Sequence, residues 1–547
     1  MNYDKKNFKG DMSGGLVAGI IALPLALAFG VQSGMGAAAG LYGAIAVGIF
    51  AAMFGGTPTQ ASGPTGPMTV VSAAIVVYAI DATGDLESGL GIILLSFLVG
   101  GILQIVLGLL GIGKYIRYFP YPVISGFMSG VGLIIIILQI WPLLGSSSPK
   151  STIDVFTDIA DPLGDINTAA VALGVLTLVV NYTFPLITKK VPSVLVALLV
   201  GTGVSLIFDL DVPVIGDIPS GIPSLQIDSF WSVAAEHYVF ILQSGMTLAL
   251  LGSIDSLLTS VIADNITKDR HDSRRELIGQ GIGNVVASVF GGIPGAGATK
   301  GTVVAINAGA KTRLSGITHG LFQLLALLGL GTLVSRIPLS VLAGLLISVG
   351  VAIIDYRSLA HLKKVPRADV LVMLIVLGWT VFGNLIHAVA AGVVLASILF
   401  MKQSADLAES ASTVKKLDPE PEWEDEAGIA ADTSIFVKHL YGPLFFGFTS
   451  GFRSLADSLP DDATTIVVRM EQVPSIDQSG LYTLEDTLLQ LVQQDKEVVV
   501  TGLQTQPEDM LRRIGIIPNL VAEEKVFATF EAFRDRDQAP ARVSDPV

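Results

Sequence analysis

The chain has 547 residues, of which 51% are hydrophobic and only 15% are charged. This apolar content exceeds what one water-soluble core can bury, so most of the chain must face lipid. The net charge of −14 argues against a nucleic acid partner, and the absence of cysteine excludes disulfides, thiolate metal sites and cysteine nucleophiles. We find no metal-ligand spacing, nucleophile–base set or phosphate loop, so neither an enzyme nor a cofactor is expected.

Apolar segments follow one another as far as residue 402, and several reach the roughly 20 residues that a membrane-spanning helix needs. The first begins after Lys5, Lys6 and Lys9 without a signal-peptide cleavage pattern, so we expect it to stay in the membrane. Fourteen segments, some of half length, are predicted at residues 14–31, 37–54, 62–80, 88–110, 121–144, 167–187, 191–208, 238–263, 277–290, 298–309, 314–333, 338–354, 368–383 and 385–401. The sequence therefore predicts an α-helical polytopic membrane protein with a transmembrane domain at residues 1–402.

The basic residues support this count, because Lys and Arg concentrate in the cytoplasmic connections of membrane proteins. They gather after even-numbered segments, as in 268–275 and 357–367, whereas the odd-numbered connections hold only Lys150 and Arg336. The odd-numbered connections instead carry acidic residues such as Asp85. We therefore expect a multi-pass protein of the inner (plasma) membrane with both termini in the cytoplasm.

Two distant stretches, Phe54–Val71 and Phe290–Val304, spell nearly the same motif rich in Gly and Pro. Each interrupts the third of seven apolar segments in its half of the chain. Paired, broken segments in corresponding places are a pointer to the midplane binding site of a transporter. Because seven is an odd number, the two halves insert with opposite orientation, which predicts a seven-plus-seven inverted repeat. The alternative is that the glycines only allow close helix packing.

Each broken segment is predicted to be an extended stretch followed by a half-helix: Thr59–Gly63 before Pro64, and Gly295–Ala298 before Thr299. Extended backbone at membrane depth is tolerated only where it is buried in protein or lines a cavity. Two helix N-termini with free N–H groups then face this cavity, an arrangement that favours an anion. Hydroxyl groups at the two breaks come from Thr65, Thr69, Thr299 and Thr302. These hydroxyls alternatively bond to the preceding helical turn.

Asp255 is the only acidic or basic residue between Tyr238 and Ala263. A carboxylate at this depth costs about 2.5–3.5 kcal/mol on insertion scales, so it calls for a partner. Thr259 follows one helical turn later on the same face. Together with carbonyl groups freed by the second broken segment, these oxygens suit Na⁺. A protonated Asp255, or an Asp255 that caps a neighbouring helix, remains an alternative.

The character of the chain changes after residue 402. Residues 403–433 are rich in Asp, Glu and Pro, which predicts a solvated linker. Residues 434–535 are predicted to form an α/β domain, with strands at Ile435–Leu440, Thr464–Arg469 and Val498–Thr501 and helices at Gln478–Gln494 and Glu508–Ile514. Residues 536–547 are polar and interrupted by proline, which predicts a loose tail.

The motifs Leu23–Gly30, Pro64–Thr69, Gly252–Asp264 and Phe290–Thr302 resemble those of the SulP family of inorganic anion transporters, over nearly the whole chain. The C-terminal domain resembles the STAS domain of that family. The resemblance implies a core domain of segments 1–4 and 8–11, a gate domain of segments 5–7 and 12–14, and elevator-like movement of the core against the gate. It also implies a homodimer formed through the STAS-like domain.

The same resemblance implies roles for individual residues. Positions that hold Na⁺ in the family match Asp255, Thr259, Gly297 and Thr299, and positions around the anion match Thr65 and Ala298, with Gly66, Thr299 and Leu25 beside them. In the STAS-like domain, Ser479 stands where soluble relatives carry a serine that can be phosphorylated. The alternative for Ser479 is a plain residue at a helix N-terminus.

Two positions depart from many sulfate- and chloride-handling relatives, and a third departs from the bicarbonate-transporting ones. Leu25 and Gly301 stand where those relatives carry Gln and Arg, which resembles bicarbonate transporters. Two half-helix dipoles balance about one negative charge, which suits a monovalent anion better than sulfate. Lys300 stands where the bicarbonate transporter has an apolar residue; its ammonium complements a dianion, extends away from the site, or pairs with a carboxylate.

The function favoured by these observations is Na⁺-coupled uptake of a small inorganic anion, bicarbonate first, with Na⁺ as the coupling ion. Two other functions stay open. One is proton-coupled transport of sulfate or a dicarboxylate, and the other is a passive anion channel.

Overall fold

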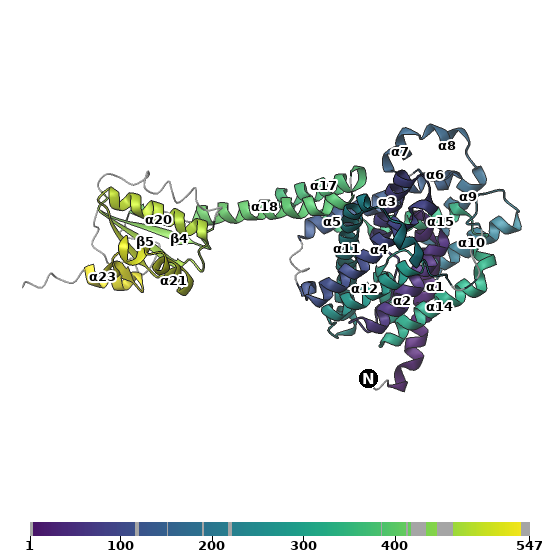
Figure 1. Ribbon diagram of the computed structural model, residues 1–547, viewed down its shortest axis with the longest axis horizontal. Helices are drawn as coiled ribbons and strands as arrows, with labels where there is room; N and C mark the ends of the chain where they lie inside the picture. Colours follow the sequence, from purple (N-terminus) through teal and green to yellow (C-terminus); the bar gives the residue numbers. More distant parts are fainter. Residues whose placement is uncertain are drawn as a thin grey trace, which may run out of the picture. The chain divides into compact units, whose positions relative to one another are not determined.

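The computed structural model describes residues 4–114, 120–149, 151–188, 191–216, 221, 223–383, 385–411, 414–416, 434–445 and 463–537. The chain divides into two compact units, Met1–Ala396 and Ser397–Val547 (Figure 1). Lys150, most of the predicted acidic linker (417–433) and the end of the predicted tail (538–547) lie outside the described residues.

The first unit is built from helices that match the predicted segments one by one within the described residues. The first half of the chain contributes α1 (Phe8–Gln32), α2 (Ala37–Phe54), α3 (Gly66–Thr83), α4 (Leu86–Leu109), α5 (Tyr121–Leu138), α6 (Ile140–Leu144), α9 (Thr168–Ile187) and α10 (Ser193–Ile207). The second half contributes α11 (Tyr238–Thr267), α12 (Ser273–Val289), α13 (Thr299–Asn307), α14 (Arg313–Val334), α15 (Leu339–Ile353), α17 (Arg367–Phe382) and α18 (Leu385–Ala411). Short helices α7 (Thr152–Thr157), α8 (Ala160–Gly164) and α16 (Tyr356–Ala360) lie in connections.

Among the described residues, eight helical stretches are long and apolar enough to cross a membrane, judged by length and composition. The longest of them, Ala235–Thr267, contains Asp255. Helix α13 has only 9 residues, as the prediction of a half-helix requires, whereas α3 has 18 residues and is one of these eight stretches, so the prediction of a half-helix is wrong for α3. The predicted α-helical polytopic class is confirmed.

Helix contacts repeat with the two halves exchanged. α1 packs against α14 as α11 packs against α4, and α2 packs against α14 as α12 packs against α4. α5 packs against α17 as α15 packs against α9. Figure 1 shows α1 and α14 side by side. Such exchanged pairs are what two structurally equivalent halves of opposite orientation produce, so the predicted inverted repeat is present in the fold.

The contacts also separate the helices into two groups. α1–α4 and α11–α14 pack mainly among themselves, and we call them the core group. α5, α9, α10, α15 and α17 form a second set of contacts, and Gly392 of α18 packs against Val376 of α17 and Val123 of α5; we call these helices the gate group. α1 and α3 contact α15 across the boundary between the groups.

The second unit is an α/β domain. Its sheet has the order β3-β4-β5-β6-β7 and consists of β3 (Val414–Lys416), β4 (Ile435–Tyr441), β5 (Thr465–Gln472), β6 (Glu497–Thr501) and β7 (Val526–Phe527), in which β3 is antiparallel to its neighbour and the other pairs are parallel. The helices include α20 (Gln478–Gln493), α21 (Thr505–Arg513), α22 (Ile516–Asn519) and α23 (Phe530–Asp537).

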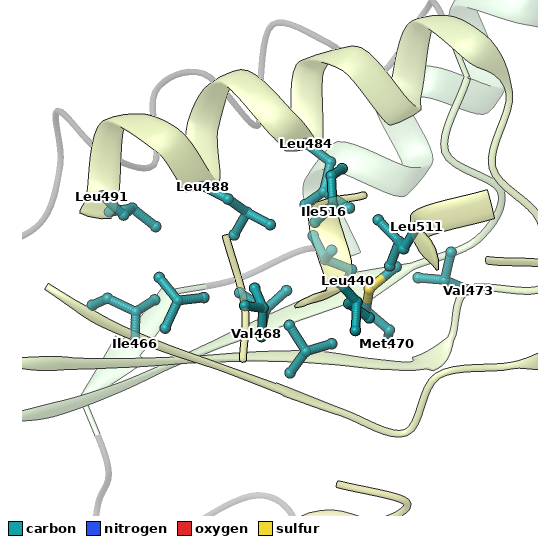
Figure 2. Packing of buried hydrophobic residues seen from close by; sticks show 14 of the residues in the cluster. Leu440, Ile466, Val468, Met470, Val473, Leu484, Leu488, Leu491, Leu511 and Ile516 are labelled. Carbon is teal, nitrogen blue, oxygen red and sulfur yellow. The ribbon is translucent and has the colours of Figure 1, made fainter. Parts of the chain in front are cut away.

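One face of α20 covers the sheet of this unit. Leu484, Leu488 and Leu491 recur at helical spacing. Figure 2 shows Leu488 and Leu491 pointing toward Val468 and Ile466 of β5, and Leu484 beside Ile516. The predicted strands and helices of this domain are therefore present within one or a few residues of their expected bounds. The short edge strands β3 and β7 were not predicted, because two or three residues carry too little alternation to be recognised.

The boundaries around residue 402 differ from the prediction. α18 does not end near residue 402 but continues to Ala411, and β3 lies inside the predicted linker 403–433. Besides polar residues, the stretch 403–411 contains Ala405, Leu407 and Ala408, which favour a helix. The sequence is therefore compatible with a helix in water. At the other end, α23 reaches Asp537, inside the predicted tail 536–547.

Helices α5 and α15 of the gate group cross at two glycines. A Cβ added at Gly132 would lie 2.7 Å from the carbonyl oxygen of Gly350, and a Cβ added at Gly350 would lie 2.7 Å from that of Gly132. Small residues at a membrane helix crossing let the two backbones approach closely.

We therefore expect Gly350→Ala to lower the free energy of unfolding by about 1–3 kcal/mol, because its methyl group meets backbone rather than a mobile side chain. Gly378 of α17 is the matched control, since a Cβ added there meets nothing within 4 Å. Gly378→Ala should change the midpoint of thermal unfolding in detergent very little. Equal midpoints of unfolding for the two variants would show that α5 and α15 pack less closely at Gly132 and Gly350 than described.

Candidate functional site

The two broken segments meet in a short antiparallel pair of strands. β1 (Ser62–Gly63) pairs with β2 (Ala296–Gly297), with Ser62 opposite Gly297 and Gly63 opposite Ala296. The N–H of Ala298 donates to the carbonyl oxygen of Ala61 (2.8 Å) and extends the pairing by one residue. Each strand leads directly into the N-terminus of a helix, α3 or the half-length α13. We call this arrangement the crossing.

The second of these helices begins at Thr299, as predicted, but the first does not begin at Pro64. α3 begins at Gly66, Pro67 is the proline of its first turn, and Thr65 is the extended residue before the helix (φ −124°, ψ 159°). The chain offers two prolines three residues apart, and either one fits a helix start. Pairing of Ser62 and Gly63 with β2 keeps the chain extended past the first proline.

Glycine is required where the two extended segments touch. A Cβ added at Gly295 would collide with the backbone of Gly63, and one added at Gly297 would collide with the side chain of Gln60. Gly295 and Gly297 therefore allow the two extended segments to approach closely, which is more than the packing of two helices alone requires.

The first turns of both helices face the crossing without a side-chain cap. The residues before the helices, Thr65 and Ala298, are extended, and neither side chain bonds to an N–H group of its helix. The first N–H groups of a helix have no partner within it, and the helix dipole adds roughly half a positive charge there. This arrangement can hold a negative group.

The threonine hydroxyls at the breaks do not bond to the preceding turn. In the part of the chain that the structure describes, the buried Oγ1 atoms of Thr65 and Thr69 have no hydrogen-bond partner. Thr302 instead bonds across the crossing, since its Oγ1 accepts from the N–H of Ala61 (3.1 Å). The alternative of local back-bonding is therefore wrong for these three residues.

Three of the predicted cation residues are joined by hydrogen bonds. The hydroxyl of Thr259 lies 2.9 Å from the carbonyl oxygen of Gly297, to which it donates, and 2.8 Å from the hydroxyl of Thr299. Asp255 lies one turn earlier on α11, and Thr65 is beside its carboxyl group. The Oδ2 atom of Asp255 is buried and makes no hydrogen bond to any described residue. The structure thus brings the predicted anion and cation residues into one region.

Asp255 lines a cavity between the core group and the gate group. The other lining residues are apolar and come from α3, α11, α5 and α18: Pro67, Val123, Ile124, Phe127, Met128, Leu251, Ile254, Leu258 and Val389. A carboxylate in such surroundings has little besides a bound ion or a proton to balance its charge.

The remaining predicted residues lie around the crossing or apart from it. A Cβ added at Gly66 would lie 2.7 Å from Cδ1 of Ile353 and 3.1 Å from Cδ1 of Ile135. Side chains of the gate group therefore pack closely against the first residue of α3. Leu25 is half-buried on α1, the helix that packs against both half-helices. Lys300 is the second residue of α13 and is exposed, without a hydrogen bond or ion pair to the described residues.

Ser479 lies in the second unit, as the second residue of α20, and is exposed. The carboxylate of Asp477 caps this helix by accepting the N–H of Gly480 (2.8 Å). Ser479 therefore occupies the N-terminal turn that the prediction assigned to it.

Sequence reasoning missed a row of polar residues on α12: Glu276, Gln280 and Asn284. They recur every four residues, which places them on one helix face. This spacing of three polar side chains in an apolar segment was the available signal. The predicted segment began at residue 277, which left Glu276 outside the membrane and hid the row.

The chain is similar to known proteins both by family and by individual relatives. Residues 8–376 match the model of the sulfate permease family, and residues 429–532 match that of the STAS domain. The chain is 38% identical to the bicarbonate transporter BicA of Picosynechococcus sp., covering 97% of this chain and 95% of the relative. It is 30% identical to the putative sulfate transporter YvdB of Bacillus subtilis, covering 94% of this chain and 95% of the relative.

Among solved structures, the transmembrane domain of a cyanobacterial bicarbonate transporter BicA is similar to this fold. The TM-score is 0.65 and the sequence identity is 42%, with 72% of this chain and 98% of that chain covered. Fold and sequence therefore give the same assignment for the membrane part.

The two equivalent threonines of α3 and α13 give a matched test of this geometry. Thr69→Val removes a hydroxyl without a protein partner and should leave the midpoint of thermal unfolding unchanged or raise it. Thr302→Val leaves the buried N–H of Ala61 without its acceptor and should cost about 1–3 kcal/mol. Unfolding in detergent checks both, and a larger loss for Thr69→Val would contradict the described hydrogen bonds.

Proposed function

Because the chain belongs to the sulfate permease family of anion transporters, we propose that it is a secondary active carrier that takes up bicarbonate together with Na⁺. The observation that carries this proposal is the free carboxylate oxygen of Asp255 beside two uncapped helix N-termini. The 38% identity to a bicarbonate transporter over 97% of the chain supports bicarbonate as the anion.

The charges at the crossing favour a monovalent anion. Two helix ends supply roughly one positive charge in total. Bicarbonate balances that charge and offers both donors and acceptors for the hydroxyl of Thr65 and the N–H groups of Gly66 and Thr299. A dianion would leave one negative charge uncompensated beside the carboxylate of Asp255.

Asp255 explains why a cation would travel with the anion. Its negative charge repels an anion at the crossing until a cation neutralises it. Na⁺ prefers several oxygen ligands, and the candidates here are Asp255, Thr259, Thr299 and the carbonyl group of Gly297. Each ion then favours the binding of the other, because coupling between two sites is reciprocal.

We further propose that the core group moves against the gate group during transport. The cavity of Asp255 lies at the boundary between the groups, and Ile135 and Ile353 of the gate group press on Gly66. Such contacts would seal the anion site on one side until the core group shifts past them. We also propose an inner-membrane location with both termini in the cytoplasm, and a homodimer formed through the STAS domain.

Asp255→Asn tests the coupling directly. It keeps the shape of the side chain but removes the charge, so Na⁺ should no longer stimulate uptake, and the rate should fall to below about a tenth of the wild-type rate. The measurement is uptake of radiolabelled bicarbonate into proteoliposomes with and without an inward Na⁺ gradient. Asp85→Asn is the control, because asparagine still caps α4. Wild-type uptake that ignores Na⁺ would refute the proposal.

Proton-coupled transport of sulfate or a dicarboxylate is the second candidate, and Lys300 together with the 30% identity to a putative sulfate transporter favours it. Under this alternative, Lys300→Met should strongly reduce uptake driven by a pH gradient, because a dianion loses its countercharge. Under our proposal, Lys300→Met leaves Na⁺-driven bicarbonate uptake within about twofold, since Lys300 makes no hydrogen bond or ion pair to the described residues. Competition by unlabelled sulfate distinguishes the bicarbonate carrier from the sulfate carrier.

Currents without saturation or coupled ions would instead indicate a channel.

A further inference from the structure

The polar row on α12 holds both extended segments of the crossing. Glu276, Gln280 and Asn284 are almost completely buried, with 1%, 0% and 2% of their surface exposed. Buried polar groups of this kind are retained only where their hydrogen bonds are made. The partners of these three side chains therefore indicate what the row does.

Glu276 accepts hydrogen bonds from the chain that leads into β1. Its Oε2 accepts the N–H groups of Gly56 and Thr57, both at 2.8 Å, and its Oε1 accepts the side-chain amides of Gln60 and Gln280, both at 2.8 Å. All four partners are N–H donors, so the group that fits here is a carboxylate, which only accepts. Charge-assisted hydrogen bonds of this type are stronger than neutral ones.

An arginine binds the same turn from another helix. Arg313, at the start of α14, donates to the carbonyl oxygen of Gly55 (2.6 Å). The turn after α2 is thus held from α12 on one side and from α14 on the other.

The next two residues of the row reach the crossing itself. The side-chain amide of Gln280 donates to the hydroxyl of Ser62 in β1 (2.7 Å). Asn284 bonds twice to Gly295, just before β2: its Oδ1 accepts the N–H (2.8 Å), and its Nδ2 donates to the carbonyl oxygen (3.0 Å). One face of one helix therefore binds the first extended segment and the second.

A hydrogen-bond path links this row to the cation residues. Oε1 of Gln60 accepts the hydroxyl of Ser260 (3.0 Å), and that hydroxyl lies 2.7 Å from Oγ1 of Thr57. Ser260 follows Thr259 on α11. The side chain that Glu276 fixes on one face thus contacts the helical turn that carries Thr259.

We propose that Glu276, Gln280 and Asn284 are positioning residues that set the register of the two extended segments, and hence the spacing of the anion and cation groups. They touch neither ion. This inference rests on the proposed coupled transport, since it assigns a role within that same site.

Glu276→Gln is the main test. Glutamine has nearly the same shape, but its NH₂ group must face N–H donors, so the turn at Gly56 is released. We expect the half-saturating concentrations of bicarbonate and of Na⁺ to rise about tenfold in proteoliposomes, while the maximal rate per folded molecule changes less than about threefold, because groups that bind both ions are displaced rather than removed.

Asp11→Asn is the matched control. Asp11 is also a fully buried acid of the core group, and it accepts the N–H groups of Lys311 and Thr312 at the start of α14 without touching the extended segments. Its removal should lower the unfolding temperature and leave both half-saturating concentrations within about twofold. A purely structural role of Glu276 predicts the same pattern for both variants.

Ser62→Ala keeps the inference testable if Glu276→Gln does not fold. It removes only the hydroxyl that Gln280 binds, and we expect a rise of about threefold in both half-saturating concentrations. Unchanged half-saturating concentrations in Ser62→Ala and in any folded Glu276→Gln would overturn the inference. Wild-type uptake that does not depend on Na⁺ would instead refute the coupled transport. The half-saturating concentration of bicarbonate in Glu276→Gln and Ser62→Ala would then still test the positioning role.

Discussion

The crossing of two extended segments is the constraint on which the rest of the structure depends. Backbone that is not helical cannot satisfy its N–H and C=O groups in lipid, so it must find partners within the protein. Here β1 and β2 pair with each other, and side chains of α11 and α12 bind much of the remaining backbone. Gly295 and Gly297 of the second motif follow from this, because a Cβ at either position would collide with the first segment.

The same constraint also leads to the two helix N-termini on which the proposed anion binding depends. Each extended segment ends at a helix N-terminus whose first N–H groups lie beyond the strand pairing and receive no side-chain cap. The proposed anion site depends on these two helix N-termini, because free N–H groups at a helix start favour a negative group. Ile135 and Ile353 of the gate group close over one of these ends.

Two acids near this site, the buried Glu276 and the half-buried Asp255, differ in what surrounds them. Glu276 accepts four hydrogen bonds, so its charge is fully engaged in holding the chain. Asp255 has an oxygen without a partner among the described residues and lies in an apolar cavity between the two helix groups. The proposed cation site rests on this difference, because only Asp255 has a carboxylate oxygen that is not already engaged by hydrogen bonds to described residues.

Much of this arrangement could be predicted from the sequence, for physical reasons. The membrane helices were recognisable because apolar length is a strong signal, and the repeat was recognisable because its glycines and prolines are spaced alike in both halves. Asp255 was recognisable because a lone acid in a long apolar run is costly.

Other features depend on contacts between distant residues and could not be predicted. The start of α3 at Gly66 rather than Pro64 depends on strand pairing with β2, which no local pattern encodes. Glu276 lies at the first turn of α12, where an acid is ordinary helix chemistry, so its partners 216–220 residues away were invisible. The pairing of β3 with β4 joins Val414 to Lys438, so no local pattern in the sequence indicates it either.

The most direct measurement of the central claim is equilibrium binding of radioactive sodium to the purified protein, with and without bicarbonate. If one crossing holds both ions, bicarbonate must tighten sodium binding, and sodium must tighten bicarbonate binding by the same factor. Sodium binding that is absent, or that is indifferent to every anion the protein transports, would contradict the account.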